Sequence, residues 1–377
     1  MISRCIRAAS AEDLGPQILA LRAEGFRPSL AIVFGCVLHN FESVADAFGQ
    51  FDIDVFGVSS AGEILAEGDG PCVFEDSIVA TLMDIDRSAY RVKLLECGEK
   101  TSLECGNELG QWAALSFLDP AVIVAASNVH TDGEQVLSGI LDAIGHDKPV
   151  FGGLAGDAHT FSETFVFTNG CTSTHAVIGL VFDRARVQIE GIAASGWQAV
   201  GAPRVVDLSV GNIVYTIDGV SAMQSYRDNL GVESQEGLVL SQYPLQIIKD
   251  GYSVLRSALG ADPSTGALLY AGSVPQGSTV RFSAFPGYEV VEEAYAEITW
   301  LHELMPSAEA VLLFSCSGRH VALGELAEDE VRPLRALWNL PVAGLYTYGE
   351  IGRNSYGVCE FHNETCVVVA MREVGGD

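Results

Sequence analysis

A pattern of strand, helix, strand and strand occurs three times along the chain, and such a repeat determines the architecture before any single motif does. Each copy opens with an apolar run typical of a strand buried on both faces, at residues 31–34, 121–124 and 310–314. Each second strand ends in a glycine followed by an acid: Gly62-Glu63, Gly156-Asp157 and Gly349-Glu350. We therefore expect three related units.

The connections within each copy indicate the kind of sheet. The link from the first to the second strand is long enough for a parallel crossover, whereas the next link has no helical pattern and suggests a hairpin or an irregular return. Mixed β-sheets flanked by helices follow, which places the chain in the α/β (α+β) class. The helix of the second copy is predicted to start with a capping box of Thr131 and Glu134.

The length of the chain indicates two domains. A chain of 377 residues is too long for one compact core, and its 48% hydrophobic content supplies enough apolar material for two. Residues 190–212 are rich in glycine, alanine and proline, so we expect an N-terminal domain at residues 1–208 and a C-terminal domain at residues 209–377. Residues 288–305 are predicted to form an amphipathic helix whose acidic side chains face water: Glu289, Glu292, Glu293 and Glu297.

Composition excludes several classes of function. The formal charge of -28 repels nucleic acid and anionic lipid surfaces, so neither is an expected partner. No apolar stretch has the length of a signal peptide or a membrane span. Nine scattered cysteines without a CxxC pair fit a reducing compartment, and the expected location is cytoplasmic.

Several segments, taken in order, resemble a known family. They are VFGVSSAGEI (55–64), VFGGLAGDAH (150–159), TIDGVSAM (216–223), LLFSCSGRH (312–320), VAGLYTYGEIG (342–352) and FHNETCVVV (361–369). Together they look like the paired N-terminal and C-terminal FIST domains, over roughly residues 29–370.

The resemblance implies a sensor in intracellular signal transduction that binds a small polar metabolite such as an amino acid. Some members of the family are haem-dependent nitric oxide sensors, and eukaryotic relatives carry an F-box. Only about 28 residues precede the first predicted strand, too few for an F-box, so the output is expected to run through a separate signalling protein. The resemblance leads us to expect glutamine at position 364, where this chain has Glu364.

The three Gly-acid corners are candidate ligand contacts. Glycine lets a ligand approach the backbone closely, and the carboxylates of Glu63, Asp157 and Glu350 could hold an ammonium or hydroxyl group. The alternative is that these acids accept backbone hydrogen bonds in ordinary turns. Both interpretations stay open at this point.

The third copy concentrates the remaining candidates. Its first strand ends in Cys316, followed by Arg319 and His320, at the edge of the sheet where ligands usually bind. If both basic side chains pointed at the thiol they would lower its pKa, which would allow a thiol-dependent enzyme using Cys316 with His320 or His362; the alternative is a small buried cysteine in a turn. Further candidates for a ligand pocket are Tyr346, Tyr348, Glu350, His362 and Asn363.

Two further functions, haem binding and enzymatic catalysis, are alternatives to a sensor of small metabolites. If the chain binds haem, Arg319 and Arg353 are the candidate partners of the propionates, and five histidines are candidate axial ligands: His130, His159, His175, His320 and His362. Asp157 and His159 lack a third metal ligand. The segments at 57–62 and 152–156 miss the nucleophile elbow and the phosphate loop respectively, so no catalytic residue is assigned and a non-enzymatic sensor is expected.

Overall fold

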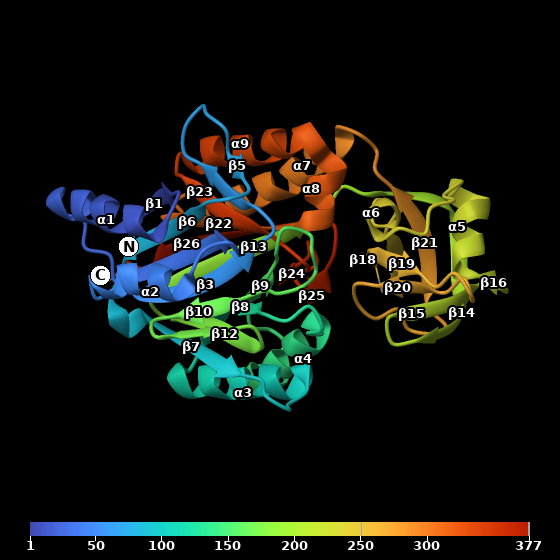
Figure 1. Cartoon of the computed structure of the whole chain (residues 1–377), viewed down its shortest axis with the longest axis horizontal. Helices are drawn as coiled ribbons and strands as arrows, with labels where there is room; N and C mark the ends of the chain where they lie inside the picture. Colours follow the sequence, from blue (N-terminus) through green and yellow to red (C-terminus); the bar gives the residue numbers. More distant parts are fainter. Residues whose placement is uncertain (250, 376–377) are drawn as a thin grey trace.

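The computed structural model describes residues 1–249 and 251–375, which fold into two bodies of unequal size (Figure 1). In these residues the larger body holds three six-stranded sheets, and the smaller body holds the strands between residues 198 and 284. The α/β class with mixed sheets is confirmed. Residue 208, the expected domain boundary, lies inside strand β14, whereas the smaller body starts near residue 198 and ends near residue 285. We call this smaller body the inserted domain.

The larger body consists of three units with one order of elements. The first unit comprises β1 (Ile2–Ala8), α1 (Leu14–Ala23), β2 (Leu30–Cys36), α2 (Phe41–Gly49), β3 (Asp54–Ser60), β4 (Glu63–Ala66), β5 (Val73–Phe74) and β6 (Ile78–Asp84). The second comprises β7 (Tyr90–Glu96), α3 (Ser102–Ser116), β8 (Pro120–Ala126), α4 (Gly133–Ile144), β9 (Val150–Leu154), β10 (Val166–Thr168), β11 (Cys171–Ser173) and β12 (Ala176–Asp183).

The third unit is interrupted by the inserted domain. It comprises β13 (Val187–Ala194), α7 (Glu289–Leu304), β22 (Ala310–Cys316), α8 (Ser317–Leu323), α9 (Ala327–Trp338), β23 (Val342–Thr347), β24 (Glu350–Arg353), β25 (Cys359–His362) and β26 (Cys366–Glu373). The inserted domain, between β13 and α7, comprises β14 (Gln198–Val210), β15 (Ile213–Ile217), β16 (Val220–Ser221), α5 (Ala222–Leu230), α6 (Gly237–Leu240), β17 (Leu245–Ile248), β18 (Ser253–Arg256), β19 (Ala258–Ala261), β20 (Leu268–Tyr270) and β21 (Thr279–Ala284). The predicted repeat is thus present, and each copy is preceded by a further strand and helix.

The three units exchange strands in a closed cycle. Within each unit the two central strands are parallel, as predicted: β2 with β3, β8 with β9, and β22 with β23. The chain then crosses into a neighbouring sheet, so that β10 pairs with β3, β24 pairs with β9, and β4 pairs with β23. The link after the second strand, which the sequence suggested to be a hairpin or an irregular return, is therefore a hairpin in each unit. Each hairpin pairs with a strand of another unit.

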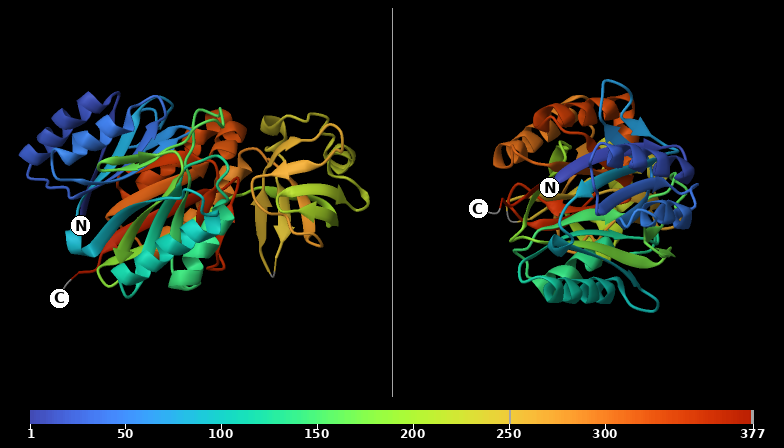
Figure 2. Two further views of the ribbon diagram at one scale, coloured as in Figure 1. Left: turned by 60° about the horizontal axis from the view of Figure 1, so that its bottom comes forward. Right: turned by 90° about the vertical axis from the view of Figure 1, so that its left-hand side faces the viewer.

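The central strands are apolar on both faces because they separate two cores. One face of each contributes to a core shared by all three units, in which the rings of Phe34 and Phe314 meet edge to face at 5.9 Å. The other face packs under the helices of its own unit. Figure 2 shows these helices as three groups on the outside of the larger body. None of the helices in the described residues is long and apolar enough to cross a membrane.

Candidate functional site

A cleft separates the inserted domain from the third unit. Its volume is about 640 Å³, and it is lined by the end of β13, by α7, by the loop at residues 354–356, and by β17, β18 and β21 of the inserted domain. Two acids of α7, Glu293 and Glu297, line the cleft, and so do Lys249 and Arg281 of the inserted domain. Carboxylates and cations therefore come to the cleft from different bodies.

Part of the charge in the cleft is already engaged. Lys249 Nζ lies 2.6 Å from a carboxylate oxygen of Glu360, which also accepts a hydrogen bond from the Tyr252 hydroxyl at 2.7 Å. Burial opposes ionisation of Glu360, but these two donors hold its pKa below the ordinary value. Arg281 donates to the carbonyl of residue 201 without an ion pair among the described residues, and Glu293 accepts one hydrogen bond from Gln198 at 3.2 Å. The carboxylates of Glu293 and Glu297 and the guanidinium of Arg281 therefore remain available for a charged ligand.

The inserted domain docks on the larger body through Arg256. Its guanidinium is buried, donates to the Phe361 carbonyl at 2.9 Å, and pairs with Glu134 at 3.3 Å. Glu134 also accepts from the Ser273 backbone at 3.1 Å. The predicted capping box at α4 is wrong, because the Asp132 side chain caps the helix and Glu134 is turned toward the inserted domain.

Arg319 is buried where both connections to the inserted domain leave the larger body. Its Nε donates to Glu330 at 2.8 Å, and the pair is fully enclosed. The same guanidinium donates to the carbonyls of Ser195, which precedes the first connection, and of Val290, which follows the second. It also donates to the Glu364 carbonyl at 3.2 Å. One side chain therefore fixes both connections to the same point.

The geometry around Cys316 does not activate its thiol. Arg319 is turned to Glu330, and the His320 ring stacks on Tyr346 with centroids 4.1 Å apart. Burial, with the neighbouring Glu350, raises the pKa of the Cys316 thiol far above its ordinary value. The hypothesis of a thiol-dependent enzyme requires both basic side chains to point at the Cys316 sulfur. Neither of them does.

Two of the Gly-acid corners hold their carboxyl groups between hydroxyl groups. Glu63 accepts from the Ser60 hydroxyl and from the backbone and side chain of Ser77, and Glu350 accepts from Thr347 at 2.6 Å and Thr365 at 3.0 Å. Both acids are fully buried, and burial raises the pKa of Glu63 to about 7 and that of Glu350 to about 8. Neither lines the cleft, and their contacts are those of acids that brace turns.

The third corner orders a loop. Asp157 accepts backbone hydrogen bonds from Thr160, Phe161 and Ser162, and a further one from the Tyr348 hydroxyl. Although burial opposes it, these donors lower the pKa of Asp157 to about 2. The Phe161 ring stacks on Tyr348 at 4.4 Å.

The three corners meet where the units exchange strands. The Ala61 amide donates to the Tyr346 carbonyl at 2.9 Å, the amide of residue 156 donates to the Ser59 carbonyl at 3.0 Å, and the Leu154 amide donates to the carbonyl of residue 349 at 2.8 Å. The structure thus brings together the predicted residues Glu63, Asp157, Tyr346, Tyr348 and Glu350, but at the crossing of the strands. Of the predicted residues, His362 lines the cleft, and Asn363 accepts from the backbone of Ser257 in the inserted domain.

The cleft does not fit a haem. His362 is the only predicted histidine ligand in its wall, but its Nε2 lies 3.2 Å from the carbonyl of residue 352, and burial lowers its pKa to about 4. The wall carries charged side chains where a macrocycle needs an apolar slot. His159 and His320 lie against the rings of Tyr348 and Tyr346 instead.

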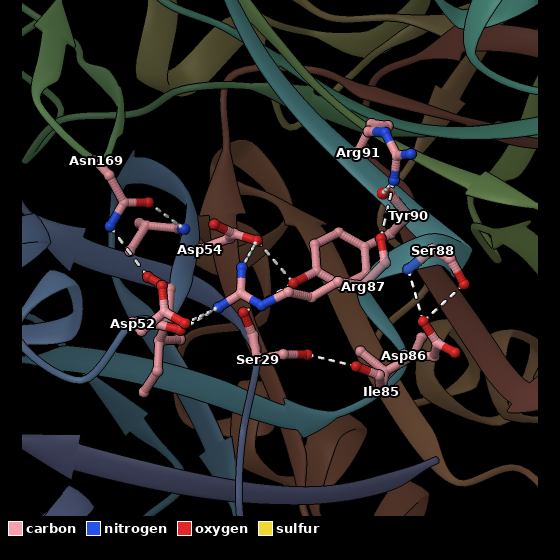
Figure 3. Close-up of polar contacts among 12 residues, drawn as sticks. Ser29, Asp52, Asp54, Ile85, Asp86, Arg87, Ser88, Tyr90, Arg91 and Asn169 are labelled. Carbon is pink, nitrogen blue, oxygen red and sulfur yellow. Dashed lines mark hydrogen bonds and ion pairs between the residues drawn. The ribbon is translucent and has the colours of Figure 1, made fainter.

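A second polar cluster lies where the parallel strands of the first unit begin. Arg87 pairs with Asp54 at 2.6 Å, and the Tyr90 hydroxyl donates to Asp54 and to the Ser29 carbonyl, both at 2.8 Å (Figure 3). The Asn169 side chain is hydrogen-bonded to the backbone on either side of Asp54. Ligands of α/β sheets bind at the opposite, carboxyl ends of strands, so this cluster is structural.

The fold is that of a three-unit α/β protein with an inserted domain bordering a polar cleft. The FIST N domain model matches residues 29–220, and the FIST C domain model matches residues 222–353. The chain belongs to the FIST family, whose domains are sensor domains of signal transduction. The two matches meet at α5, inside the inserted domain.

Similar mycobacterial proteins include an uncharacterized protein of Mycobacterium bovis, 26% identical over 215 residues, which are 54% of this chain and 55% of the relative. An uncharacterized protein of Mycobacterium tuberculosis is 23% identical over 229 residues, 56% of this chain and 59% of the relative. The chain thus spans little more than half the length of the curated relatives it matches.

Proposed function

We propose that the chain is a sensor that binds a small polar metabolite with both charge signs, such as an amino acid, in the cleft. The cleft of about 640 Å³ between the two bodies carries this proposal. Glu293 and Glu297 on α7 suit an ammonium group, and Arg281 on the facing inserted domain suits a carboxylate. The ligand would then bridge the bodies.

Signalling follows from the way the bodies are joined. A ligand that contacts both walls binds the closed arrangement better than an open one and shifts the population toward it. The closed arrangement presents a different surface to a separate partner protein, which carries the output. Identical small-angle scattering profiles with and without bound ligand would refute this mechanism.

A thermal-shift screen of amino acids and related metabolites tests the binding. A ligand at 100 times its Kd stabilises the folded chain by about 2.7 kcal/mol, which shifts the melting temperature measurably. We expect the binding of that ligand, measured by calorimetry, to weaken at least tenfold in Glu297→Gln and in Arg281→Gln.

Glu289→Gln is the matched control, because Glu289 lies on the same helix and does not line the cleft. Its affinity should equal that of the unmodified chain. A ligand that binds equally well to all three variants, or a screen in which no metabolite binds, argues against a site in the cleft.

A further inference from the structure

One carboxyl group is enclosed between the two bodies with little to stabilise its charge. Glu364 is fully buried, and the Ser257 hydroxyl of the inserted domain donates to its Oε1 at 2.7 Å. Among the described residues, its Oε2 has no hydrogen-bond partner. An ionised carboxylate needs several donors when it is buried, whereas a protonated carboxyl needs fewer.

The backbone and the neighbours of Glu364 hold the side chain in this place. Glu364 has a φ of +56°, a conformation that residues with side chains rarely adopt. A Cβ atom at Gly318 would lie 2.3 Å from Oε1, so the absence of a side chain there makes room for the carboxyl group. A strained backbone at Glu364, beside a glycine that leaves room for its side chain, favours a functional role for the carboxyl group.

The charged and titratable groups around Glu364 do not supply a dedicated counter-ion. Arg319 on α8 favours its ionisation, but that guanidinium is engaged by Glu330 and by the backbone carbonyl of Glu364, not by its carboxyl group. Glu350 on β24 and Cys316 on β22 are both acidic neighbours, and negative charge on either opposes negative charge on Glu364. From the inserted domain, the neutral hydroxyl of Ser257 donates to the carboxyl group, whereas the guanidinium of the preceding Arg256 is directed to the Phe361 carbonyl and to Glu134.

We propose that Glu364 is a proton-operated latch: it carries a proton while the inserted domain is docked and releases it to water when the domain lifts. Docking is therefore tighter in acid and looser toward neutral pH. The latch acts on docking alone and does not depend on a ligand in the cleft.

The direction and size of the effect follow from linkage. Burial raises the pKa of Glu364 from 4.5 to about 7 in the docked state. Between these values the docked state holds a proton that the lifted state does not, so the equilibrium constant for lifting rises about tenfold per pH unit and levels off above pH 7.

Amide hydrogen exchange of residues 253–261, corrected for the intrinsic pH dependence of exchange, measures lifting in the intact chain. We expect protection of this segment to fall about tenfold per pH unit from pH 5 to 7 and then to stay constant. In Glu364→Gln, which is neutral at every pH and keeps the acceptor oxygen, protection should equal the acid value throughout.

Two variants keep the test decisive. Glu63→Gln replaces an equally buried acid of the first unit and should leave the pH slope of residues 253–261 unchanged. Ser257→Ala removes the donor to Glu364 and should extend the falling range to higher pH. A segment whose protection has no pH slope, or a slope that survives in Glu364→Gln, overturns the proposal.

Discussion

Replacing Arg319 by methionine should destabilise the protein more than any other single loss of charge described above. The guanidinium is fully buried and pairs with Glu330, which is 97% enclosed. Methionine has a similar reach and no charge, so Arg319→Met leaves a carboxylate in the interior without its partner. It also removes the donor that holds the carbonyls of Ser195 and Val290.

The size of the effect can be worked out from these contacts. Removing one partner of a buried ion pair costs about 3–5 kcal/mol, because the remaining charge stays uncompensated. Replacing both partners removes that cost, while the freed backbone carbonyls still cost about 1–3 kcal/mol. We therefore expect Arg319→Met to lose about 6 kcal/mol and Glu330→Met about 4 kcal/mol, whereas the double variant should lose only about 2 kcal/mol and be more stable than either single variant.

Urea unfolding followed by circular dichroism and tryptophan fluorescence measures these free energies. The control is Arg332→Met, since Arg332 makes an ion pair with Glu328 at 2.6 Å in which the side chains are 41% and 35% exposed; a pair in contact with water should contribute less than about 1 kcal/mol. If Arg319→Met and Arg332→Met lose the same stability, or if the double-mutant cycle shows no coupling, the role assigned to the buried pair is wrong.

Three further changes have defined outcomes. Gly152→Ala should cost about 3 kcal/mol or more in thermal unfolding, because φ is +137° and the new Cβ would lie 1.9 Å from a backbone oxygen, whereas Gly68→Ala has open space and should be neutral. Asp157→Asn should cost about 2 kcal/mol at pH 7, because the pKa of Asp157 is about 2 in the folded chain and 3.8 in the unfolded chain. This contribution to stability is present above pH 3.8 and is lost as the pH falls toward 2. A cost that persists at pH 2 contradicts it. Iodoacetamide should label the half-buried Cys171 before the buried Cys316, and equal rates would contradict the burial of the latter thiol.

The repeat could be predicted because short apolar runs in the sequence indicate its strands. Apolar runs such as residues 31–34 and 310–314 indicate strands covered on both sides, and they are the central strands of the shared core. The exchange of hairpins was not predictable, since no local pattern states that β4 pairs with β23 from the other end of the chain. Edge strands such as β7 were missed because polar residues interrupt their apolar pattern.

The candidate site was predicted only in part. The sequence located reactive side chains in the third copy, and His362 does line the cleft. The prediction that the acids of α7 face water is confirmed, since Glu293 and Glu297 are exposed, but the pattern of one helix could not reveal that these two also line a cleft. The lone Arg256 in an apolar strand was a usable signal, since a cation in such a run needs a buried partner.

The cyclic exchange also sets the order in which the protein is completed during synthesis. Strand β4 is made about 280 residues before its partner β23. At a synthesis rate of about 5–20 residues per second, the edge of β4 that pairs with β23 stays unpaired for roughly 15–55 s. The sheet of the third unit, which supports the cleft, is therefore finished last, when the first two units have already emerged from the ribosome.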